Sequence, residues 1–244
     1  MKVKKNYLVA CFFMLLIFDS YAFPPAKNFH LIKDGVMVYP DTNLSGKNVR
    51  MVRLLVVTDK IVRISASPQL KFSDEESLIT VYKDLKKSFT VTNVNDKVIV
   101  KTGSLSATIL LSSGAVSFAD KNGTPILMER QYHGREITPA VFEGMRSYGL
   151  SQTFETAADD AYYGLGQHQG DQFNYKGQQV FLFQNNTEVA IPFLLSNKNY
   201  GILWDNYSIT KVGDARDFMP LSKLKLFSKD GDEGWLTASY SNDK

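Results

Sequence analysis

Residues 49–66 read VRMVRLLVVTDKIVRISA, and they form the strongest β-strand pattern in the chain. β-Branched residues crowd 49–58 and 61–66, and the two-residue gap Asp59-Lys60 is the spacing of a hairpin turn. Side chains alternate between the two faces of a strand. In the first of these strands both faces are mostly apolar, which is typical of an inner strand that is covered on both sides.

The same pattern continues along most of the chain. Turn-forming pairs such as Asn95-Asp96 and Asn122-Gly123 separate short apolar runs. We predict that 178–184 and 187–195 form a hairpin around Asn185-Asn186, with Pro192 placing the second strand at a sheet edge or at a bulge. The other predicted strands are 88–94, 97–101, 104–111, 115–119, 125–128 and 145–157.

Little of the chain indicates helix. Residues 74–85 form one helix candidate with Ser73 as its N-cap, and 23–46 is predicted as a loop-rich entry. Strands recur every 8–12 residues or so, and no strand–helix–strand alternation is present. The sequence therefore predicts an all-β fold, an antiparallel β-sandwich, and its 44% hydrophobic content is sufficient for a core.

The chain divides into three predicted parts. Residues 1–22 form a leader, 23–222 a single β-sandwich domain, and 223–244 a linker that leads into the first strand of a further module at 235–240. Because this last strand would lack partners of its own, we expect the chain to be a fragment that stops before a further domain.

The first 22 residues have the features of a secretory signal peptide. Three lysines in the first five residues precede an apolar run at 8–18 and a cleavage site at Ser20-Tyr21-Ala22. A lipoprotein signal is the rival interpretation, since residues 8–11 read LVAC. Most of the apolar run follows Cys11 instead of preceding it, so lipid anchoring is disfavoured and we predict export to the periplasm or the cell exterior.

Cleavage of this leader changes both the charge and the cysteine content. It removes the single cysteine of the chain, so the exported domain is predicted to fold without disulfides. It also leaves 25 basic and 24 acidic residues, a formal net charge of +1. A nearly neutral domain gives no electrostatic reason to bind nucleic acid, and we expect no DNA or RNA partner.

The polar run that follows Tyr163-Gly164-Leu165-Gly166 is the best candidate for ligand contacts. Amide, imidazole and carboxylate groups beside an aromatic ring suit a hydroxyl-rich ligand. A purely structural role, in which His168 is a hydrogen-bonded loop histidine, is the alternative. The predicted pocket-bordering residues are Gln167, His168, Gln169, Asp171, Asn174 and Tyr175.

Other kinds of site fit the sequence poorly. The glycines of this region do not have the spacing of a dinucleotide-binding loop. The three histidines are scattered, so we expect neither a metal nor any other cofactor, and His133 is predicted to be a solvated loop residue. Asp159 and Asp160 are adjacent and cannot flank one bond, so they are predicted to form a solvated turn and no catalytic residue is assigned.

Four motifs together resemble the N-terminal domain of glycoside hydrolase family 31, of the bacterial α-xylosidase type. They are YGLGQHQ at 163–169, NYKG at 174–177, PFLLS at 192–196 and YGILWDN at 200–206. The resemblance extends roughly over 47–217 and implies a β-sandwich of the galactose-mutarotase-like supersandwich type, placed before a (β/α)₈ barrel.

The resemblance also implies where the chemistry lies. The family is retaining, with a nucleophilic aspartate and an acid/base aspartate in the barrel about 5–5.5 Å apart. Neither aspartate can be assigned to this chain, which we expect to end before the barrel and to be inactive alone. A sandwich loop walls the pocket in such enzymes, and 167–176 is the matching stretch. The strand at 235–240 resembles the start of an inserted protective-antigen-type β-module.

The leading hypothesis is therefore the N-terminal domain of an exported α-xylosidase that acts on plant-wall oligosaccharides such as xyloglucan fragments. The oligosaccharide would be bound by the full-length enzyme, together with its C-terminal barrel. Three alternatives stay open: a free-standing carbohydrate-binding module, an α-glucosidase or α-galactosidase of the same family, and a mutarotase-like epimerase. The last would need a general acid and a general base in one cleft.

Overall fold

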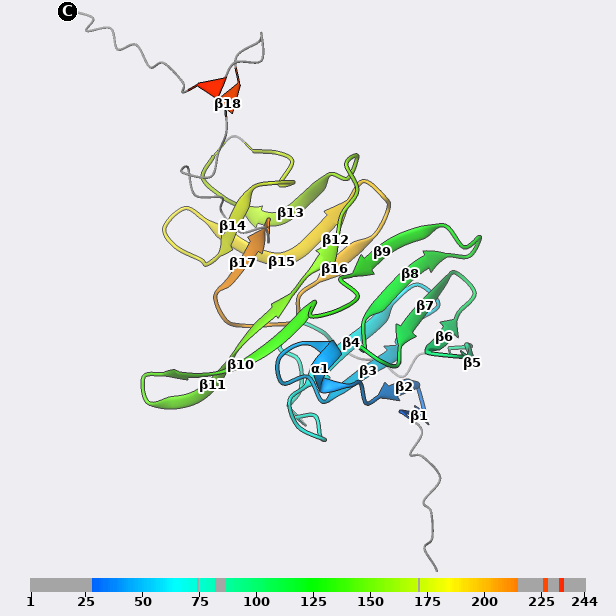
Figure 1. Ribbon diagram of the computed structural model, residues 1–244. Coiled ribbons are helices and arrows are strands. Elements are labelled where there is room, and N and C mark those ends of the chain that lie inside the picture. Colours follow the sequence, from blue (N-terminus) through cyan, green and yellow to red (C-terminus); the bar gives the residue numbers. More distant parts are fainter. Residues whose placement is uncertain are drawn as a thin grey trace, which may run out of the picture.

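The computed structural model describes residues 28–73, 75–81, 87–170 and 172–214, together with the backbone of 226–227 and 233–234. The predicted signal peptide, 1–22, and the predicted module strand, 235–240, lie outside these ranges. Every strand pair is antiparallel, and the helix that the described residues contain is the single turn α1 (Thr42–Ser45) (Figure 1). The predicted all-β fold class is confirmed.

Two sheets form the larger part of the fold. The first has the order β1-β2-β3-β4, and the second has the order β12-β9-β8-β7-β6-β5. The strands of the first sheet are β1 (Phe29–Ile32), β2 (Gly35–Val38), β3 (Met51–Val56) and β4 (Val62–Ser67). Those of the second are β5 (Thr90–Val94), β6 (Lys97–Lys101), β7 (Leu105–Leu110), β8 (Val116–Asp120), β9 (Pro125–Glu129) and β12 (Phe154–Glu155).

These two sheets enclose the main hydrophobic core. Fully buried side chains from both sheets make one cluster, which identifies the arrangement as a β-sandwich. Each fully buried valine, leucine or isoleucine side chain contributes about 1.5–3 kcal/mol through burial. The cluster consists of Val36, Val38, Leu54, Val56, Val98, Val100, Ala107, Ile109, Leu111 and Val116.

The hairpin predicted from residues 49–66 is present. β3 pairs with β4 on one side and with β2 on the other, so it is the inner strand that the sequence predicts. Its alternate residues Val52, Leu54 and Val56 are buried, and Arg53 and Leu55 on the opposite face are half-buried.

Two local predictions were wrong. The entry predicted as loop contains the β1–β2 hairpin, in which Lys33-Asp34 is the turn and Val36 and Val38 enter the core. The described part of the predicted helix, 75–81, contains no helix. There the hydroxyl of Ser77 accepts from the backbone N–H groups of Ile79 and Thr80, a local bond that competes with helix. The remainder of that helix candidate lies outside the described residues.

A smaller stack of strands follows the sandwich (Figure 1). One sheet has the order β13-β15-β16 and the other pairs β14 with β17, with Leu165, Val180 and Leu182 buried between them. β18 and β19 pair with each other near the C-terminal end. The strands are β13 (Tyr162–Gln167), β14 (Gln179–Leu182), β15 (Val189–Ser196), β16 (Gly201–Leu203), β17 (Thr210–Gly213), β18 (Leu226–Phe227) and β19 (Glu233–Gly234).

This stack corrects the predicted hairpin around Asn185-Asn186. Both strands exist, but β14 pairs with β17 and β15 pairs with β13 and β16. The reason is their packing, because Val180 and Leu182 face Leu194 and Ala190 across the core between the two sheets. The segments therefore stack face to face instead of sharing a ladder.

A long hairpin projects away from both stacks (Figure 1). β10 (Arg135–Phe142) pairs over its whole length with β11 (Met145–Gln152). The turn residues Glu143 and Gly144 both have positive φ, 48° and 79°, as a two-residue type I′ turn requires. The strand predicted at 145–157 divides at Thr153 into β11 and β12, which belong to different sheets.

A buried ion pair fixes the base of this hairpin. Arg135 Nη2 donates to both carboxylate oxygens of Glu129, at 2.7 and 2.6 Å, and each residue is 8% exposed. The backbone N–H of Val116 donates to the same carboxylate, and Arg135 Nε donates to Gln152. Burial raises the pKa of the Glu129 carboxyl, and the Arg135 guanidinium opposes that rise.

A polar cluster ties the first sheet to the segment that follows β16. Arg63 on β4 donates to Asp205 at 2.9 Å, and the hydroxyl of Ser77 donates to the same carboxylate. The hydroxyl of Tyr207 accepts from the backbone N–H of Leu78. The sandwich and the smaller stack are thus connected by hydrogen bonds between distant parts of the sequence.

Candidate functional site

The strand β13 carries the YGLGQ motif, and its glycines have a packing role. Gly164, Leu165 and Gly166 all have positive φ, at 94°, 63° and 103°. A Cβ at Gly166 would lie 1.8 Å from the carbonyl oxygen of Val189 on β15. The glycines therefore allow the two strands to approach closely.

Opposite these glycines the ladder between β13 and β15 is irregular. Gly164 pairs with Leu194 and Gly166 pairs with Ala190, so the register shifts between them. Pro192 lies in the shifted part of β15, where its missing N–H removes no regular ladder bond. The predicted irregularity at Pro192 is confirmed, although β15 is the central strand of its sheet.

His168 lies just after β13 and is held by its neighbours. Its side chain is 9% exposed, and Nε2 lies 2.9 Å from the carbonyl oxygen of Leu165. Nδ1 is 3.9 Å from Glu188, and the ring meets Tyr175 edge-on at 6.3 Å between centroids. These contacts match the structural alternative, a hydrogen-bonded loop histidine.

The two glutamines on either side of His168 are exposed. Gln169 donates from its amide nitrogen to the hydroxyl of Thr187 at 3.1 Å, and its backbone N–H donates to Glu188. Gln167 ends β13 opposite Val189. Glu188 thus contacts both His168 and the backbone of Gln169. Both glutamine side chains stay accessible to a ligand.

The remaining predicted residues mostly hold the loop in place. The side-chain oxygen of Asn174 accepts from the backbone N–H groups of Tyr162 and Lys176, which closes the segment back onto β13. Tyr175 packs against the buried cluster of Leu165, Val180 and Leu182. Asp171 lies outside the described residues.

Phe173 is a residue of this segment that sequence reasoning missed. It is 81% exposed and lies beside the ring of Tyr163, with 5.1 Å between the ring centroids. The available signal was an aromatic residue inside an otherwise polar run. Trp204, which follows β16, has a buried indole nitrogen without a hydrogen-bond partner among the described residues.

The turn before β13 carries several charges. Asp159 is exposed and receives a hydrogen bond from Lys198, which lowers the pKa of Asp159. The hydroxyl of Tyr162 donates to Asp160 at 3.1 Å. Burial raises the pKa of the Tyr162 phenol, and Tyr200 and Asp160 raise it further, so the hydroxyl stays protonated. The predicted solvated turn holds for Asp159, whereas Asp160 is half-buried and also accepts from the backbone N–H of Ala157.

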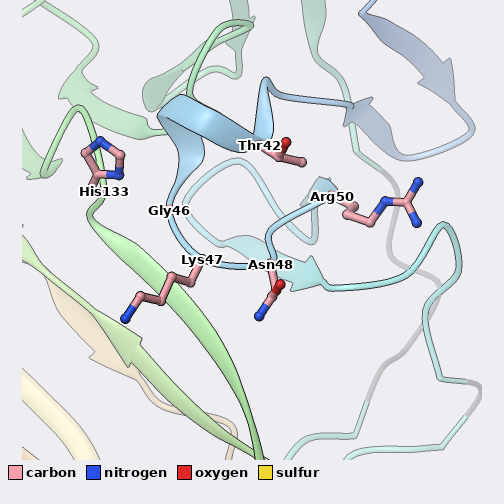
Figure 2. Close-up of a pocket in the computed structure, with 6 residues that line it drawn as sticks. All are labelled: Thr42, Gly46, Lys47, Asn48, Arg50 and His133. Atoms are coloured by element: carbon pink, nitrogen blue, oxygen red, sulfur yellow. The ribbon is translucent and has the colours of Figure 1, made fainter.

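A hollow of about 520 Å³ lies beside α1 (Figure 2). Figure 2 shows that the side chains around it point in different directions and do not converge on one point. His133 is exposed there, as predicted. This hollow does not arrange its polar groups around a common ligand position; it is lined by Thr42, Gly46, Lys47, Asn48, Arg50 and His133.

Within the described ranges, no three His, Cys, Asp or Glu side chains are grouped so that they could hold a metal ion. The same part of the chain has no helix that is long and apolar enough to span a membrane.

Comparison with known proteins identifies the fold. Residues 51–212 match the family described as Glycosyl hydrolase 31 N-terminal galactose mutarotase-like domain. The chain belongs to glycoside hydrolase family 31. The matched residues of this family 31 domain contain the sandwich from β3 onward, the projecting hairpin and the candidate segment, whereas β1 and β2 precede them.

Individual relatives agree with this assignment. The crystal structure of the family 31 α-xylosidase from Xanthomonas citri has a TM-score of 0.71 and 42% identity, covering 84% of this chain and 22% of its own. An α-xylosidase from Saccharolobus solfataricus is 30% identical over 190 residues, 74% of this chain. An uncharacterized family 31 glucosidase from Pseudescherichia vulneris is 29% identical over 130 residues, 53% of this chain.

The chain spans about a quarter of the length of the curated relatives it matches. It is the N-terminal galactose-mutarotase-like domain of a family 31 glycoside hydrolase and is similar to α-xylosidases. The resemblance seen in the YGLGQHQ, NYKG, PFLLS and YGILWDN motifs is confirmed.

Proposed function

We propose that this domain is the non-catalytic N-terminal part of an exported α-xylosidase that acts on plant-wall oligosaccharides, and that it borders the active-site pocket. The observation that carries the proposal is the 42% identity to the Xanthomonas citri α-xylosidase over 84% of this chain, with a TM-score of 0.71.

The segment 167–176 is the part of the domain that would border the pocket. It presents the exposed amides of Gln167 and Gln169 beside the exposed ring of Phe173. Amides donate and accept hydrogen bonds with sugar hydroxyls, and an aromatic face stacks on the apolar face of a sugar ring. His168 and Asn174 hold this segment against β13 and so act as positioning residues.

Hydrolysis itself is assigned to a barrel outside this chain. A retaining glycosidase needs two carboxyl groups about 5–5.5 Å apart. Glu188, the carboxylate that contacts the described part of the segment, is already engaged by His168 and by the backbone of Gln169. Its engagement favours a structural role.

Export follows from the leader. Residues 1–22 combine a basic start, an apolar run and a small-residue cleavage site, and they contain Cys11, the single cysteine of the chain. A sandwich that depends on burial alone tolerates an oxidising compartment. Fusion of residues 1–22 to a reporter enzyme tests this point, and a reporter retained in the cytoplasm would contradict it.

The catalytic assignment is tested with an aryl α-xyloside. The chain alone is expected to release no product, whereas a chimera in which it replaces the matching N-terminal part of the Xanthomonas citri enzyme is expected to hydrolyse the substrate. Turnover by the isolated chain would place the catalytic groups within these residues and would refute the assignment.

A free-standing carbohydrate-binding module is the second candidate, and the exposure of Phe173 is the observation that favours it. Titration calorimetry of the chain with xyloglucan oligosaccharides distinguishes the two, because a binding module holds its ligand without a barrel. The match to a family 31 glucosidase supports α-glucosidase specificity as a further alternative. α-Galactosidase specificity is the third alternative. The chimera cannot distinguish these substrate specificities, because its barrel comes from the Xanthomonas citri enzyme. The rates at which the full-length enzyme hydrolyses aryl α-xyloside, α-glucoside and α-galactoside distinguish them.

A further inference from the structure

The projecting hairpin has one long side that no other strand covers. β11 pairs with β10 without interruption from Met145 to Gln152, and β10 is its one strand partner among the described residues. Every residue of β11 before Gln152 is exposed. The side of β11 that points away from β10, which we call the free side of β11, is therefore open to solvent (Figure 1).

A hydrogen bond of β10 shows which backbone groups lie on this side. The N–H of Ile137 donates to the carbonyl oxygen of Lys47, so it points away from β11. In an antiparallel ladder the two residues of a pair both point toward or both point away from the partner strand, and the direction alternates. Leu150 pairs with Ile137, so its N–H and C=O lie on the free side, and those of Tyr148 and Arg146 follow at alternate positions.

The corresponding side of β10 is less suited to a further strand. Its base is occupied, because Asn48 Nδ2 donates to the carbonyl oxygen of Ile137 at 2.9 Å and Lys47 accepts from the N–H of the same residue. Two positions further on, Pro139 has no N–H. Natural edge strands are protected from pairing by proline, bulges and charges. β11 has no proline and no bulge in its register with β10, and Arg146 is its one charged residue.

We propose that the free side of β11 binds the free side of β11 in a second copy of this chain. Two identical strands can pair antiparallel about a twofold axis, which gives a closed dimer. With Gly149 of the two copies face to face, Tyr148 lies opposite Leu150 of the second copy and Arg146 lies opposite Gln152 of the second copy. Each of these pairs joins residues whose backbone groups lie on the free side, so each can exchange two hydrogen bonds.

The side chains of β11 are complementary to themselves in this register. Tyr148 and Leu150 lie on the same face of the strand, and they are 46 and 51% exposed. The twofold axis generates two Tyr148–Leu150 pairs, each of which contributes about 0.2–1 kcal/mol. Gly149 occupies the central pair, where the two backbones approach most closely, and it has no side chain to separate them. This self-complementarity is why we assign the free side to a second copy of the chain.

The dimer would contain one continuous antiparallel sheet in the order β10-β11-β11-β10. The inference goes beyond the proposed function, since it uses no residue of the segment 167–176 and no catalytic group. Activity of the chimera toward an aryl α-xyloside therefore reports on the proposed function alone, and the state of association of the chain reports on the inference alone.

An engineered thiol tests the register. Gly149→Cys, made together with Cys11→Ser, would carry the single thiol of the chain. The fold has room for it, because a Cβ at this position would lie 3.9 Å from the carbonyl oxygen of Thr138. Two such thiols face each other at the twofold axis, so oxidation with diamide is expected to give mostly covalent dimer. The matched control is Ser147→Cys, whose two thiols would be about 14 Å apart because Ser147 lies opposite Ser151 of the second copy.

Sedimentation equilibrium tests the interaction itself. The parent chain is expected to be in a reversible monomer–dimer equilibrium. Tyr148→Lys/Leu150→Lys places like charges opposite each other twice and removes both apolar pairs, so the dissociation constant should rise at least about tenfold. The control Thr138→Lys/Ala140→Lys adds the same charge at the same spacing to exposed positions of β10 and should leave the constant unchanged.

Every other result contradicts the inference. A parent chain that sediments as a monomer at all concentrations would overturn it. A dimer that the two lysine variants weaken equally would place the contact elsewhere on the molecule. Cross-linking through Ser147→Cys that equals or exceeds cross-linking through Gly149→Cys would exclude the proposed pairing of the two strands.

Discussion

Replacement of Arg135 by methionine tests the energetic role of the buried ion pair. The guanidinium donates to both oxygens of Glu129, at 2.7 and 2.6 Å, while the N–H of Val116 supplies a third bond at 2.9 Å. Arg135→Met removes two of these three bonds and leaves a carboxyl group that is 8% exposed. Breaking a buried pair from one side costs about 3–5 kcal/mol.

Urea unfolding followed by circular dichroism measures this cost, with the free energy extrapolated to water. The control is Arg130→Met, because Arg130 pairs with Glu155 at 3.9 Å and both side chains are more than half exposed, at 58 and 55%. An exposed pair of this kind contributes about 0–1 kcal/mol. The double variant Glu129→Gln/Arg135→Met should recover most of the loss, since glutamine still accepts from Val116 without a buried charge.

The loss should also depend on pH in a defined direction. Burial raises the pKa of Glu129 above its unfolded value, so its contribution to stability is full below about pH 4 and is lost as pH rises through the folded pKa. Without Arg135 only the bond from the backbone N–H of Val116 opposes this rise in pKa. The deficit of Arg135→Met should therefore be smaller at pH 5 than at pH 8. A deficit equal to that of Arg130→Met, or one that is larger at pH 5, would refute the reasoning.

Three further predictions concern other parts of the domain. Gly166→Ala should cost roughly 3 kcal/mol or more of unfolding free energy in urea, because φ is 103° and the new Cβ would meet Val189. The control Gly144→Ala, in the open turn, should cost about 1 kcal/mol. Equal costs would contradict the packing role. Asp205→Ala should cost about 1–3 kcal/mol by leaving Arg63 without its carboxylate, and Asp205→Asn should cost less, as measured by thermal unfolding. Backbone hydrogen bonds, chiefly from Thr124, lower the pKa of Asp120. The ionised carboxylate therefore stabilises the fold above about pH 4, and this stabilisation is lost as the pH falls through the folded pKa. Asp120→Asn should thus reduce the slope of stability between pH 5 and 3, and an unchanged slope would count against this.

Local alternation was sufficient to predict many of the strands. The 49–66 hairpin, β6 and the β7–β8–β9 series were found because each strand adjoins the next along the chain and a short turn signal separates them. The inner position of β3 was also visible, since its apolar residues occupy both faces.

Strand partners that depend on distant parts of the chain could not be predicted. β14 and β15 are neighbours in sequence with a good turn between them, yet Val180 and Leu194 meet across a core and their strands pair elsewhere. β13 was missed for a related reason. Its glycines indicate a turn when they are considered alone, and only the close approach of Val189 shows that they belong to a strand.

The candidate site was located correctly as a segment but not residue by residue. Polar composition identified 167–176, whereas the burial of His168 and the two backbone bonds of Asn174 depend on how the segment folds back on β13. Phe173 was passed over because an apolar residue in a polar run is usually buried, and here it is not.

The β10–β11 ribbon has a practical consequence for work with the isolated domain. Five successive residues of each strand, about 17 Å at ~3.4 Å per residue, stand clear of the rest of the described chain with no third strand on either side. Both edges of the ribbon therefore carry backbone donors and acceptors that can pair with a strand of a neighbouring molecule. Pro139 weakens pairing at the β10 edge, because proline has no backbone N–H to donate. The exposed apolar side chains of Phe142 and Met145 at the tip favour association instead. Concentrated samples of the domain should therefore be handled as a protein prone to edge-to-edge association.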